Sequence, residues 1–419
     1  MHKIEKLLQT LAPKGVEFKT LEEVFEIKNG YTPSKNNPEF WKNGTIPWFR
    51  MEDLRENGRI LKDSIQHITP KALKGKKLFP KNSIIISTTA TIGEHALLIV
   101  DSLANQQFTF LSKKANCNLA LDMKFFFYQC FLLGEWCKNN TNVSGFASVD
   151  MTAFKKYKFP IPPLEIQQEI VKILDAFTEL NTELNTELKA RKKQYQYYQN
   201  MLLDFNDINS NHQDAKEKLA QKTYPKNLKT LLQTLAPKGV EFRKLGEVCD
   251  FQKGKSITKK AVTLGKVPVI SGGRQPAYYH NEANRSGETI AISSSGVYAG
   301  YVSYWDIPVF LADSFSVSPK QKTLMPKYLF HYLTTQQDAI HATKSTGGIP
   351  HVYSKDLQNF LIPIPPLEVQ QEIVKILDQF SILTTDLLAG IPAEIEARKK
   401  QYEYYREKLL AFKPLQNKA

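Results

Sequence analysis

Cysteine is scarce in this sequence, with four residues in 419: Cys117, Cys130, Cys137 and Cys249. Their spacing contains no Cys-x-x-Cys pair, and no group of histidines accompanies them. A disulfide-stabilised fold and a structural zinc site both need clustered cysteines, so the sequence argues against both. We therefore expect buried thiols and no metal site.

A long hydrophobic run is also missing. The most apolar stretch, residues 119–133, is interrupted by Asp122 and Lys124 and is too short to cross a bilayer. The opening segment MHKIEKLLQTLA has no continuous apolar core of the kind a secretory signal carries. We expect a soluble cytoplasmic protein that does not bind membranes.

The common catalytic motifs are absent as well. The sequence has no GxxxxGK[ST] phosphate loop, no HExxH and no GxSxG, and its eight histidines are scattered. The segment Asn37-Pro38-Glu39-Phe40 partly resembles the Asn-Pro-Pro-aromatic motif of amino-methyltransferases. However, it lacks the second proline, and no glycine-rich cofactor loop accompanies it. The sequence thus argues against a self-contained modification enzyme, and we assign no catalytic residue.

What the sequence does contain is an internal repeat. PIPPLEIQQEIVKILD at 160–175 recurs as PIPPLEVQQEIVKILD at 363–378, and only Ile166 changes, to Val369. ARKKQYQYY and ARKKQYEYY follow the two copies. Apolar residues after each proline pair alternate steps of three and four, which predicts long helices with a coiled-coil seam. Because each seam needs a cover and the other copy matches it in length, we expect the two helices to pair as a rigid spacer.

A second repeat marks where two non-helical segments begin. LLQTLAPKGVEF occurs at 7–18 and again, unchanged, at 231–242. Between these shared ends, both segments carry β-branched and aromatic runs, glycine turns and one late helix, and the first segment is 21 residues longer. We expect an α/β or α+β fold used twice, to recognise two different things.

Three local features refine this organisation. TELNTELNTEL at 178–188 is a four-residue repeat within the first helix and locally unwinds the supercoil. Gly390 and Pro392 predict a break in the second helix. Residues 205–226 are polar and predict a linker. The expected boundaries are a first recognition domain at 1–162, a helix at 163–204, the linker at 205–226, a second recognition domain at 227–365, a helix at 366–412 and a tail at 413–419.

The positive charge is unevenly distributed. The formal net charge is +14, of which residues 1–163 carry +8 and residues 227–366 carry +7, whereas the helical segments are nearly neutral. An excess confined to two segments is typical of a protein that contacts a polyanion at two places. A basic protein whose surface lysines merely keep it soluble remains an alternative.

The basic segments combine hydrogen-bond donors with aromatic residues. Arg, Lys, Asn and Gln can read base edges, whereas Ser, Thr and Lys mostly bind phosphates. The candidates in the first segment are Lys28, Asn29, Tyr31, Thr32, Ser34, Lys35, Trp48 and Arg50. Those in the second are Lys253, Lys255, Ser256, Arg274, Gln275, Tyr278, Tyr279 and the adjacent His280. Taken singly, each of them is more often a solvated loop residue than a base reader.

Tyrosines form a third group of candidates, on the two long helices. The clusters are Tyr195, Tyr197 and Tyr198, and Tyr402, Tyr404 and Tyr405. Their rings either bind a partner protein or pack one helix against the other, and the sequence does not decide between these roles.

The duplicated PIPPLE and ARKKQY helices and the two LAPKGVEF segments resemble the specificity subunit of type I restriction-modification enzymes. This resemblance covers essentially the whole chain. It implies two target recognition domains, each reading one half of a bipartite DNA sequence, joined by an antiparallel pair of long helices. In this family a four-residue repeat in the central helix sets the gap between half-sites, and TELNTELNTEL looks like that element.

The resemblance also implies a subunit without catalysis of its own. Its partners would be double-stranded DNA, two adenine-N6 methyltransferase subunits and ATP-driven restriction subunits. S-adenosylmethionine, ATP and Mg would bind those partners, and no cofactor would bind this chain. The alternative function from another class is a coiled-coil scaffold whose basic lobes bind protein or RNA.

Overall fold

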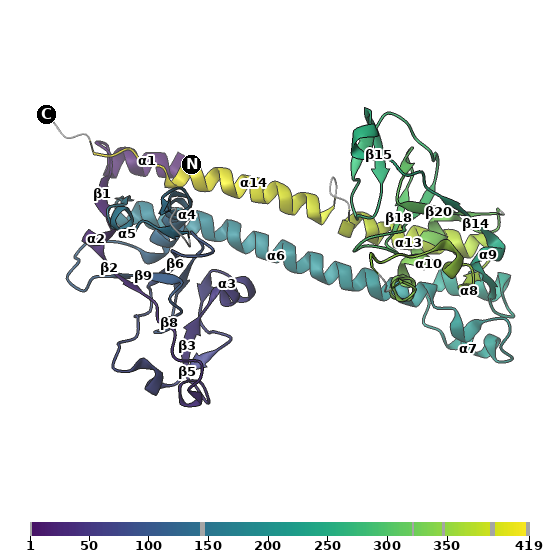
Figure 1. Cartoon of the computed structure of the whole chain (residues 1–419), viewed down its shortest axis with the longest axis horizontal. Helices are drawn as coiled ribbons and strands as arrows, with labels where there is room; N and C mark the ends of the chain where they lie inside the picture. Colours follow the sequence, from purple (N-terminus) through teal and green to yellow (C-terminus); the bar gives the residue numbers. More distant parts are fainter. Residues whose placement is uncertain (1, 143–146, 321, 346–347, 386–389, 416–419) are drawn as a thin grey trace. The chain divides into compact units, whose positions relative to one another are not determined.

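The computed structural model describes residues 2–142, 147–320, 322–345, 348–385 and 390–415 (Figure 1). The chain divides into two compact units. Unit 1 comprises Met1–Glu183 and Glu396–Ala419, and unit 2 comprises Leu184–Ile395. Unit 1 is therefore built from two stretches that are far apart in the sequence.

Unit 1 contains two main sheets. The larger has the strand order β2-β9-β6-β7-β4 and the smaller β5-β3-β8. Their bounds are β2 Phe25–Asn29, β3 Ile46–Phe49, β4 Ile60–Leu61, β5 His67–Ile68, β6 Ile84–Ser87, β7 His95–Leu98, β8 Leu103–Ala104 and β9 Phe108–Lys113. All side chains of β6 and β7 are buried, so the middle of the larger sheet lies in the core.

Unit 2 repeats this arrangement in the same strand order. Its larger sheet is β14-β20-β17-β18 and its smaller sheet is β16-β15-β19. The bounds are β14 Cys249–Lys253, β15 Leu264–Ile270, β16 Tyr278–His280, β17 Thr289–Ser293, β18 Val302–Trp305, β19 Phe310–Leu311 and β20 Ser314–Pro319. In both units the middle strand of the smaller sheet pairs in parallel with the strand that follows the larger sheet's hairpin. The predicted α/β (α+β) fold in two similar copies is confirmed.

The extra length of the first copy forms additional elements around the smaller sheet. Between β3 and β5 unit 1 carries α3 (Met51–Asn57) and β4, and two short 3-10 helices, η1 (Pro38–Phe40) and η2 (Pro70–Leu73), flank the same sheet. A further hairpin joins β10 (Thr141–Asn142) and β11 (Ser148–Val149). The counterpart region of unit 2 has η4 (Lys259–Ala261).

One helix covers the larger sheet in each unit. In unit 1 it is α4 (Met123–Asn139), which begins where the Asp122 carboxylate accepts the N–H groups of Lys124 and Phe125. Most of α4 is buried, including three consecutive phenylalanines at 125–127. The late helix of unit 2 is α10 (Pro326–Thr335), followed by α11 (Gln337–Ala342). The late helix expected in each segment is thus present.

In each copy, a short strand near the start pairs with a short strand near the end. β1 (Glu17–Thr20) pairs with β12 (Lys158–Ile161), and β13 (Glu241–Lys244) pairs with β21 (Leu361–Ile364), both antiparallel. The remaining short helices of the two copies are α1 (His2–Leu11), α2 (Leu21–Val24), α5 (Met151–Lys155), α8 (Lys226–Leu235), α9 (Leu245–Val248) and α12 (Ser354–Leu357). The two repeated sequence motifs therefore meet within each unit.

The long helices take the chain from unit 1 to unit 2 and back again. α6 (Leu164–Leu203) is continuous and begins in unit 1 and ends in unit 2, whereas α13 (Leu367–Thr385) begins in unit 2 and α14 (Ile391–Leu410) ends in unit 1. In unit 1 Phe177 of α6 stacks on Tyr405 of α14, with ring centroids 5.5 Å apart. In unit 2 Phe380 of α13 stacks on Tyr198 of α6 at 4.9 Å. The predicted pairing of helices from the two copies is therefore present inside each unit.

The first glutamine of the repeated Gln-Gln-Glu segment is buried and has the same structural role in both copies. Gln370 is fully buried, and its amide donates to the backbone oxygens of Thr323 and Pro365, at 2.8 and 2.7 Å. Its Oε1 accepts the N–H of Met325 at 2.8 Å, at the start of α10. Gln167 makes the same three bonds in unit 1. Each glutamine fixes its long helix to the preceding loop by satisfying otherwise unpaired backbone groups.

The polar segment after α6 is folded, which corrects the expected linker. η3 (Asn206–Ile208) and α7 (Ala215–Gln221) lie within it. Ile208, Leu219 and Tyr224 are buried in the main core of unit 2. The segment is polar because one side faces solvent, while a few widely spaced apolar side chains attach it to the domain.

The predicted break near Gly390 falls partly outside the described residues, which omit 386–389. α13 ends at Thr385 before this gap, and α14 begins at Ile391 after it, with Pro392 in its first turn, where the missing N–H has no cost. Gly390 itself is a bend and not helical.

Candidate nucleic-acid interface

Three loops of unit 2 meet at one end of its larger sheet. β20 pairs antiparallel with both β14 and β17, so Lys253 lies opposite Phe315, and Ser293 lies opposite Ser314. The end of β14, the start of β20 and the end of β17 are therefore neighbours. The turns that follow or precede these strand ends form a common surface.

A glycine allows these loops to approach closely. The N–H of Gly254 donates to the Ser314 oxygen at 2.8 Å, and a Cβ at this position would lie 2.4 Å from the Ala312 oxygen. Gly30 has the same place in unit 1, where its N–H donates to the Phe108 oxygen at 2.8 Å and a Cβ would meet the Asn105 oxygen. Both glycines serve the close passage of two backbones.

A fourth loop, the segment before α12, completes a recess of about 470 Å³ in unit 2. Val352 N–H donates to the Ser294 oxygen at 3.0 Å, and Ser295 and His351 form an isolated β-bridge. The His351 and Tyr353 rings stack with centroids 5.9 Å apart, and the Lys355 ammonium lies 5.4 Å from the Tyr353 ring. The recess is lined by Lys253, Gly254, Ser256, Ser294, Ser295, Ala312, Asp313, Ser314, Phe315, His351, Val352, Tyr353, Ser354 and Lys355.

Unit 1 builds the same junction with different side chains. Thr89 and Ser148 form the corresponding isolated bridge, and Val149 N–H donates to the Thr88 oxygen at 2.9 Å. The turn between β8 and β9 carries Asn105, Gln106 and Gln107, where unit 2 has Ala312 and Asp313. The backbone frame is shared and the side chains that line it differ, as expected for two sites of different specificity.

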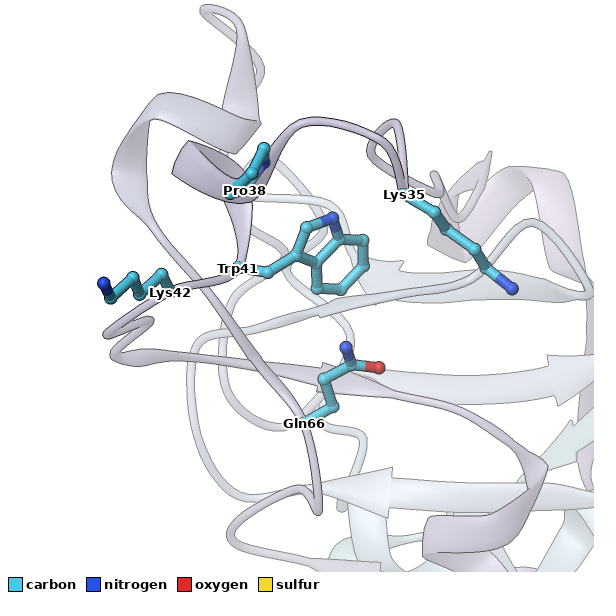
Figure 2. Close-up of a pocket in the computed structure, with 5 residues that line it drawn as sticks. All are labelled: Lys35, Pro38, Trp41, Lys42 and Gln66. Atoms are coloured by element: carbon cyan, nitrogen blue, oxygen red, sulfur yellow. The ribbon is translucent and has the colours of Figure 1, made fainter.

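Unit 1 also carries an open pocket of about 590 Å³ beside its smaller sheet (Figure 2). Figure 2 shows the Gln66 amide directed toward the Trp41 ring, while Lys42 points away from it. Trp41 packs edge-on against Trp48 with centroids 5.0 Å apart, and its indole N–H donates to the Ser34 oxygen at 2.9 Å. These two contacts fix the Trp41 ring in the pocket wall, which also includes Lys35 and Lys42.

Most of the residues that the sequence singled out in unit 1 are accessible. Lys28, Asn29, Ser34 and Lys35 are exposed, and Lys35 lines the pocket of Figure 2. Tyr31 and Thr32 are half-buried: Tyr31 lies under the Lys76 ammonium at 4.0 Å, and Thr32 donates to Gln106. The assignment of these residues as DNA contacts stays a prediction.

Two residues of the first segment have structural contacts. Trp48 is only 2% exposed and its indole N–H donates to the Tyr31 oxygen at 2.9 Å, which corrects the expectation that it contacts a ligand directly. The Arg50 guanidinium lies 5.8 Å from the Trp48 ring, and its Nε is 3.8 Å from a Glu52 carboxylate oxygen. Arg50 therefore has a neighbour for its charge before any ligand binds.

In unit 2 the predicted residues separate into two groups. Lys253 and Ser256 line the recess, and Lys255 is exposed beside them. Arg274 and Gln275 are exposed on the turn between β15 and β16, and the Arg274 guanidinium lies 5.0 Å from the Tyr298 ring. Tyr278 is half-buried and Tyr279 exposed on β16. His280 is buried and its Nδ1 contacts the Thr263 backbone, so it is not a surface donor.

The sequence did not identify Ser294, Ser295, Asp313 and the His351–Lys355 loop as parts of the site. For Ser294, Ser295 and Asp313 the available signal was positional, because they lie next to the ends of β17 and β20. The His351–Lys355 loop precedes α12 and is not next to a strand of the larger sheet, so nothing in the sequence indicates that it joins the other loops.

Arg285 holds the end of β14 in place next to β20. Its guanidinium donates to the Gln252 and Lys253 oxygens at 3.0 and 3.1 Å and to the Ser316 hydroxyl at 2.9 Å. Burial lowers the pKa of Arg285 from its ordinary value of 12.5. These bonds position the end of β14 that bears Lys253.

The tyrosine clusters of the long helices have two different environments. Tyr198 and Tyr405 stack on phenylalanines of the facing helix, and the Tyr195 hydroxyl lies 3.3 Å from His331 Nδ1. Tyr402 lies near Phe177, and burial raises its pKa above 10.0. By contrast, Tyr197 and Tyr404 are 62% and 57% exposed. Three of the six, Tyr198, Tyr402 and Tyr405, therefore pack one long helix against the other, Tyr195 contacts α10, and two are available to a partner.

Comparison with known proteins identifies the family. The model of the type I restriction modification DNA specificity domain matches the chain twice, at residues 13–194 and 237–397. The chain belongs to the specificity subunits of type I restriction-modification systems. It is 39% identical to the EcoprrI specificity subunit of Escherichia coli over 92% of this chain and 91% of that protein. It is 32% identical to the EcoR124I/EcoR124II specificity subunit of Escherichia coli over 65% and 69%, respectively.

Solved structures of specificity subunits share the fold. A crystal structure of the type I system S subunit from M. genitalium has a TM-score of 0.57 at 19% identity and covers 94% of this specificity subunit and 95% of that chain. A chain from a study of complex assembly in a type I system has a TM-score of 0.55 at 18% identity, over 95% and 98%. This protein is therefore a DNA-recognition subunit with the architecture of its family.

The described part of the specificity subunit contains neither a metal site nor a membrane-spanning helix. No three His, Cys, Asp or Glu side chains gather there in a way that suits a metal ion. No helix among the described residues has the length and apolar character needed to span a bilayer. Burial raises the pKa of Cys130, Cys137 and Cys249, which disfavours the reactive thiolate at these positions.

Proposed function

We propose that each unit of this specificity subunit reads one half of a bipartite duplex DNA target. The observation that carries the proposal is the shared backbone frame, in which the loops at one end of the larger sheet bear different polar side chains in the two units. A common backbone frame that carries different polar side chains suits two half-sites of different sequence. The relatives are named as specificity subunits of restriction enzymes, and this supports the same role here.

The charge distribution supports contact with the DNA backbone. Residues 251–281 contain six Lys and Arg and no Asp or Glu, and residues 65–81 contain five Lys and no acid. The first run includes β15 and β16 and the second includes β5, which are strands of the smaller sheets of their units. Basic side chains displace the counterions of DNA, so binding should weaken steeply as salt is added.

We further propose that the long helices set the gap between the half-sites and bind two methyltransferase subunits. α6 is helical throughout the TELN repeat, with Leu180, Leu184 and Leu188 half-buried. The exposed Tyr197 and Tyr404 occupy matching positions in the two copies of the repeat. Methyl transfer and DNA cleavage would then belong to the methyltransferase and restriction subunits. These partners, and not this chain, would bind S-adenosylmethionine, ATP and Mg, and the complex would work in the cytoplasm.

The test is a competition binding experiment on the purified chain, alone and with its methyltransferase. The chain alone should bind duplex DNA with a steep salt dependence, and the complex should prefer duplexes that carry the bipartite motif mapped by methylome sequencing. A coiled-coil scaffold whose basic lobes bind protein or RNA predicts no preference for duplex DNA. Methyl transfer by the chain alone with S-adenosylmethionine would contradict the division of labour.

A further inference from the structure

Asp313 is the residue of the unit 2 recess whose chemistry contrasts with its surroundings. It is exposed on the turn between β19 and β20, and it is the only acidic side chain among the described residues that line the recess. Lys253 and Lys355 line the same recess, and the acid-free run of residues 251–281 begins on its wall. No described residue forms a hydrogen bond or ion pair with the Asp313 carboxylate. Its charge is therefore not used to hold the fold together.

A carboxylate in this position is unfavourable for binding the DNA backbone, because it faces phosphates of the same charge. It becomes favourable only when it accepts a hydrogen bond from a donor on the ligand. In the major groove, the donors that DNA offers are the exocyclic amino groups of cytosine (N4) and adenine (N6). Guanine and thymine present oxygen acceptors there and would repel a carboxylate.

The rigidity of the turn suits such a reader. The Asp313 oxygen accepts Ser294 N–H at 2.9 Å, and Ala312 N–H donates to the Ile270 oxygen at 2.8 Å. Gly254 packs against the backbone of Ala312 on the other side. Three strands thus fix the backbone that carries the carboxylate, while its side chain extends from an exposed position.

Resting on the proposed function of DNA recognition, we propose that Asp313 determines specificity in unit 2 by accepting a hydrogen bond from the amino group of adenine or cytosine at one position of its half-site. In unit 1 the equivalent residue is Gln107, whose backbone oxygen accepts Thr88 N–H at 3.1 Å, and its neutral amide donates to the Thr91 hydroxyl at 3.5 Å. Unit 1 consequently lacks the electrostatic rejection of guanine and thymine at the corresponding place. The two units would therefore differ in how strongly they reject guanine and thymine at the base that faces this turn.

The test compares Asp313→Asn with the matched control Asp306→Asn, an equal change of charge at an exposed aspartate of the same unit. Each variant is produced with the methyltransferase in cells, and methylome sequencing maps the methylated motif. For Asp313→Asn we expect one adenine- or cytosine-specified position in a single half-site to accept guanine or thymine. The other half-site and the gap should stay unchanged. Asp306→Asn should keep the parental motif.

A binding measurement makes the result independent of methylation. The complexes are titrated with duplexes that differ only at the identified position, and the ratio of affinities for amino and keto bases should fall by roughly 10- to 100-fold in Asp313→Asn. Asp313→Ala should show the same loss of discrimination. If affinity instead changes equally for all duplexes, or the motif keeps every position, Asp313 is not a base reader. A parental complex that shows no bipartite motif would instead overturn the proposed function itself.

Discussion

The buried Gln370 shows how much one side chain of the repeat contributes to a unit. Its amide satisfies two backbone oxygens and one backbone N–H. Replacing Gln370 by Ala leaves these groups unpaired, and we expect a loss of about 3 kcal/mol in the free energy of unfolding. Denaturant unfolding followed by circular dichroism measures this.

The neighbouring residue provides a control. Gln371 is exposed on the same helix, so Gln371→Ala should change the free energy of unfolding by less than about 0.5 kcal/mol. Equal effects of the two substitutions would show that the buried bonds do not stabilise unit 2.

His95 makes the stability of unit 1 sensitive to acid. It is buried between Phe127 and Phe131, and its Nε2 has no hydrogen-bond partner. Burial, reinforced by the charge of Arg59, lowers the pKa of His95 from 6.5 to about 3. The unfolded chain binds this proton below pH 6.5 and the folded chain does not, so stability falls as the pH drops from 6.5 toward 3.

We expect His95→Phe to flatten this dependence, because phenylalanine keeps the aromatic packing and does not titrate. Thermal unfolding between pH 7 and pH 4 should show a smaller loss of melting temperature than in the parent. The exposed His212 serves as the control, and His212→Asn should retain the parental slope. Identical slopes in His95→Phe and the parent would contradict the assignment.

At the residue scale, the sequence identified accessible donors such as Lys253 and Lys35 but misjudged Trp48 and His280. Amino-acid type indicates what a side chain is able to bind, whereas burial depends on strand pairing that one sequence does not reveal. Asp313 was missed for the opposite reason, since an acid in a basic segment gave no signal until its loop was placed beside Lys253 and Lys355.

Among the elements, the long helices present the clearest surface for a partner. Tyr197 and Tyr404 are exposed, so Tyr197→Ala together with Tyr404→Ala should abolish co-purification of the methyltransferase without changing the melting temperature. Affinity purification of the co-expressed subunits tests this. Tyr198→Ala and Tyr405→Ala are informative controls, because they remove stacked rings and should instead lower stability.

The TELN repeat allows a second test at this scale. Deleting one four-residue unit shortens α6 by about 6 Å and rotates its end by roughly 40° relative to a full turn. We expect a methylated motif with a changed gap and unchanged half-sites, as read by methylome sequencing. Altered bases in either half-site would contradict the spacer role.

The sequence predicted the long helices and their pairing because a period of three and four residues persists over many turns. It failed for residues 205–226, where Ile208, Leu219 and Tyr224 are too widely spaced to form a pattern. Short elements that depend on a few anchoring contacts are not visible in periodicity. The expected break at Gly390 was predictable, since Gly and Pro act locally.

On the scale of the molecule, unit 1 depends on residues near the end of the chain. Leu409 and Leu410 are buried in its core, and Phe412 packs on Phe125. Truncation after Ile395 should therefore destabilise unit 1 by several kcal/mol while unit 2 keeps its core. Limited proteolysis should degrade the first 183 residues and spare a fragment near 184–395. A truncation after Leu415 removes none of these contacts and should behave as the parent.

The doubled fold was predictable at this scale because the repeated motifs frame both copies. Which helices belong to each unit was less predictable from the sequence. The seam indicated that the helices pair, but only the contacts of Phe177 and Phe380 show that each unit is closed by a helix from the other copy.

This dependence of unit 1 on residues 396–415 has a consequence for how the protein is made. The ribosome releases all of unit 2 before it releases the helix that unit 1 needs, so the first domain synthesised is the last to be completed. Until then the Phe177 ring of α6 lacks its contacts with Tyr402 and Tyr405 of α14. A nascent chain of this kind is exposed to misassembly with neighbouring chains for most of its translation. Prior folding of unit 2 reduces the number of flexible residues between unit 1 and α14, and this lowers the entropic cost of bringing the two together.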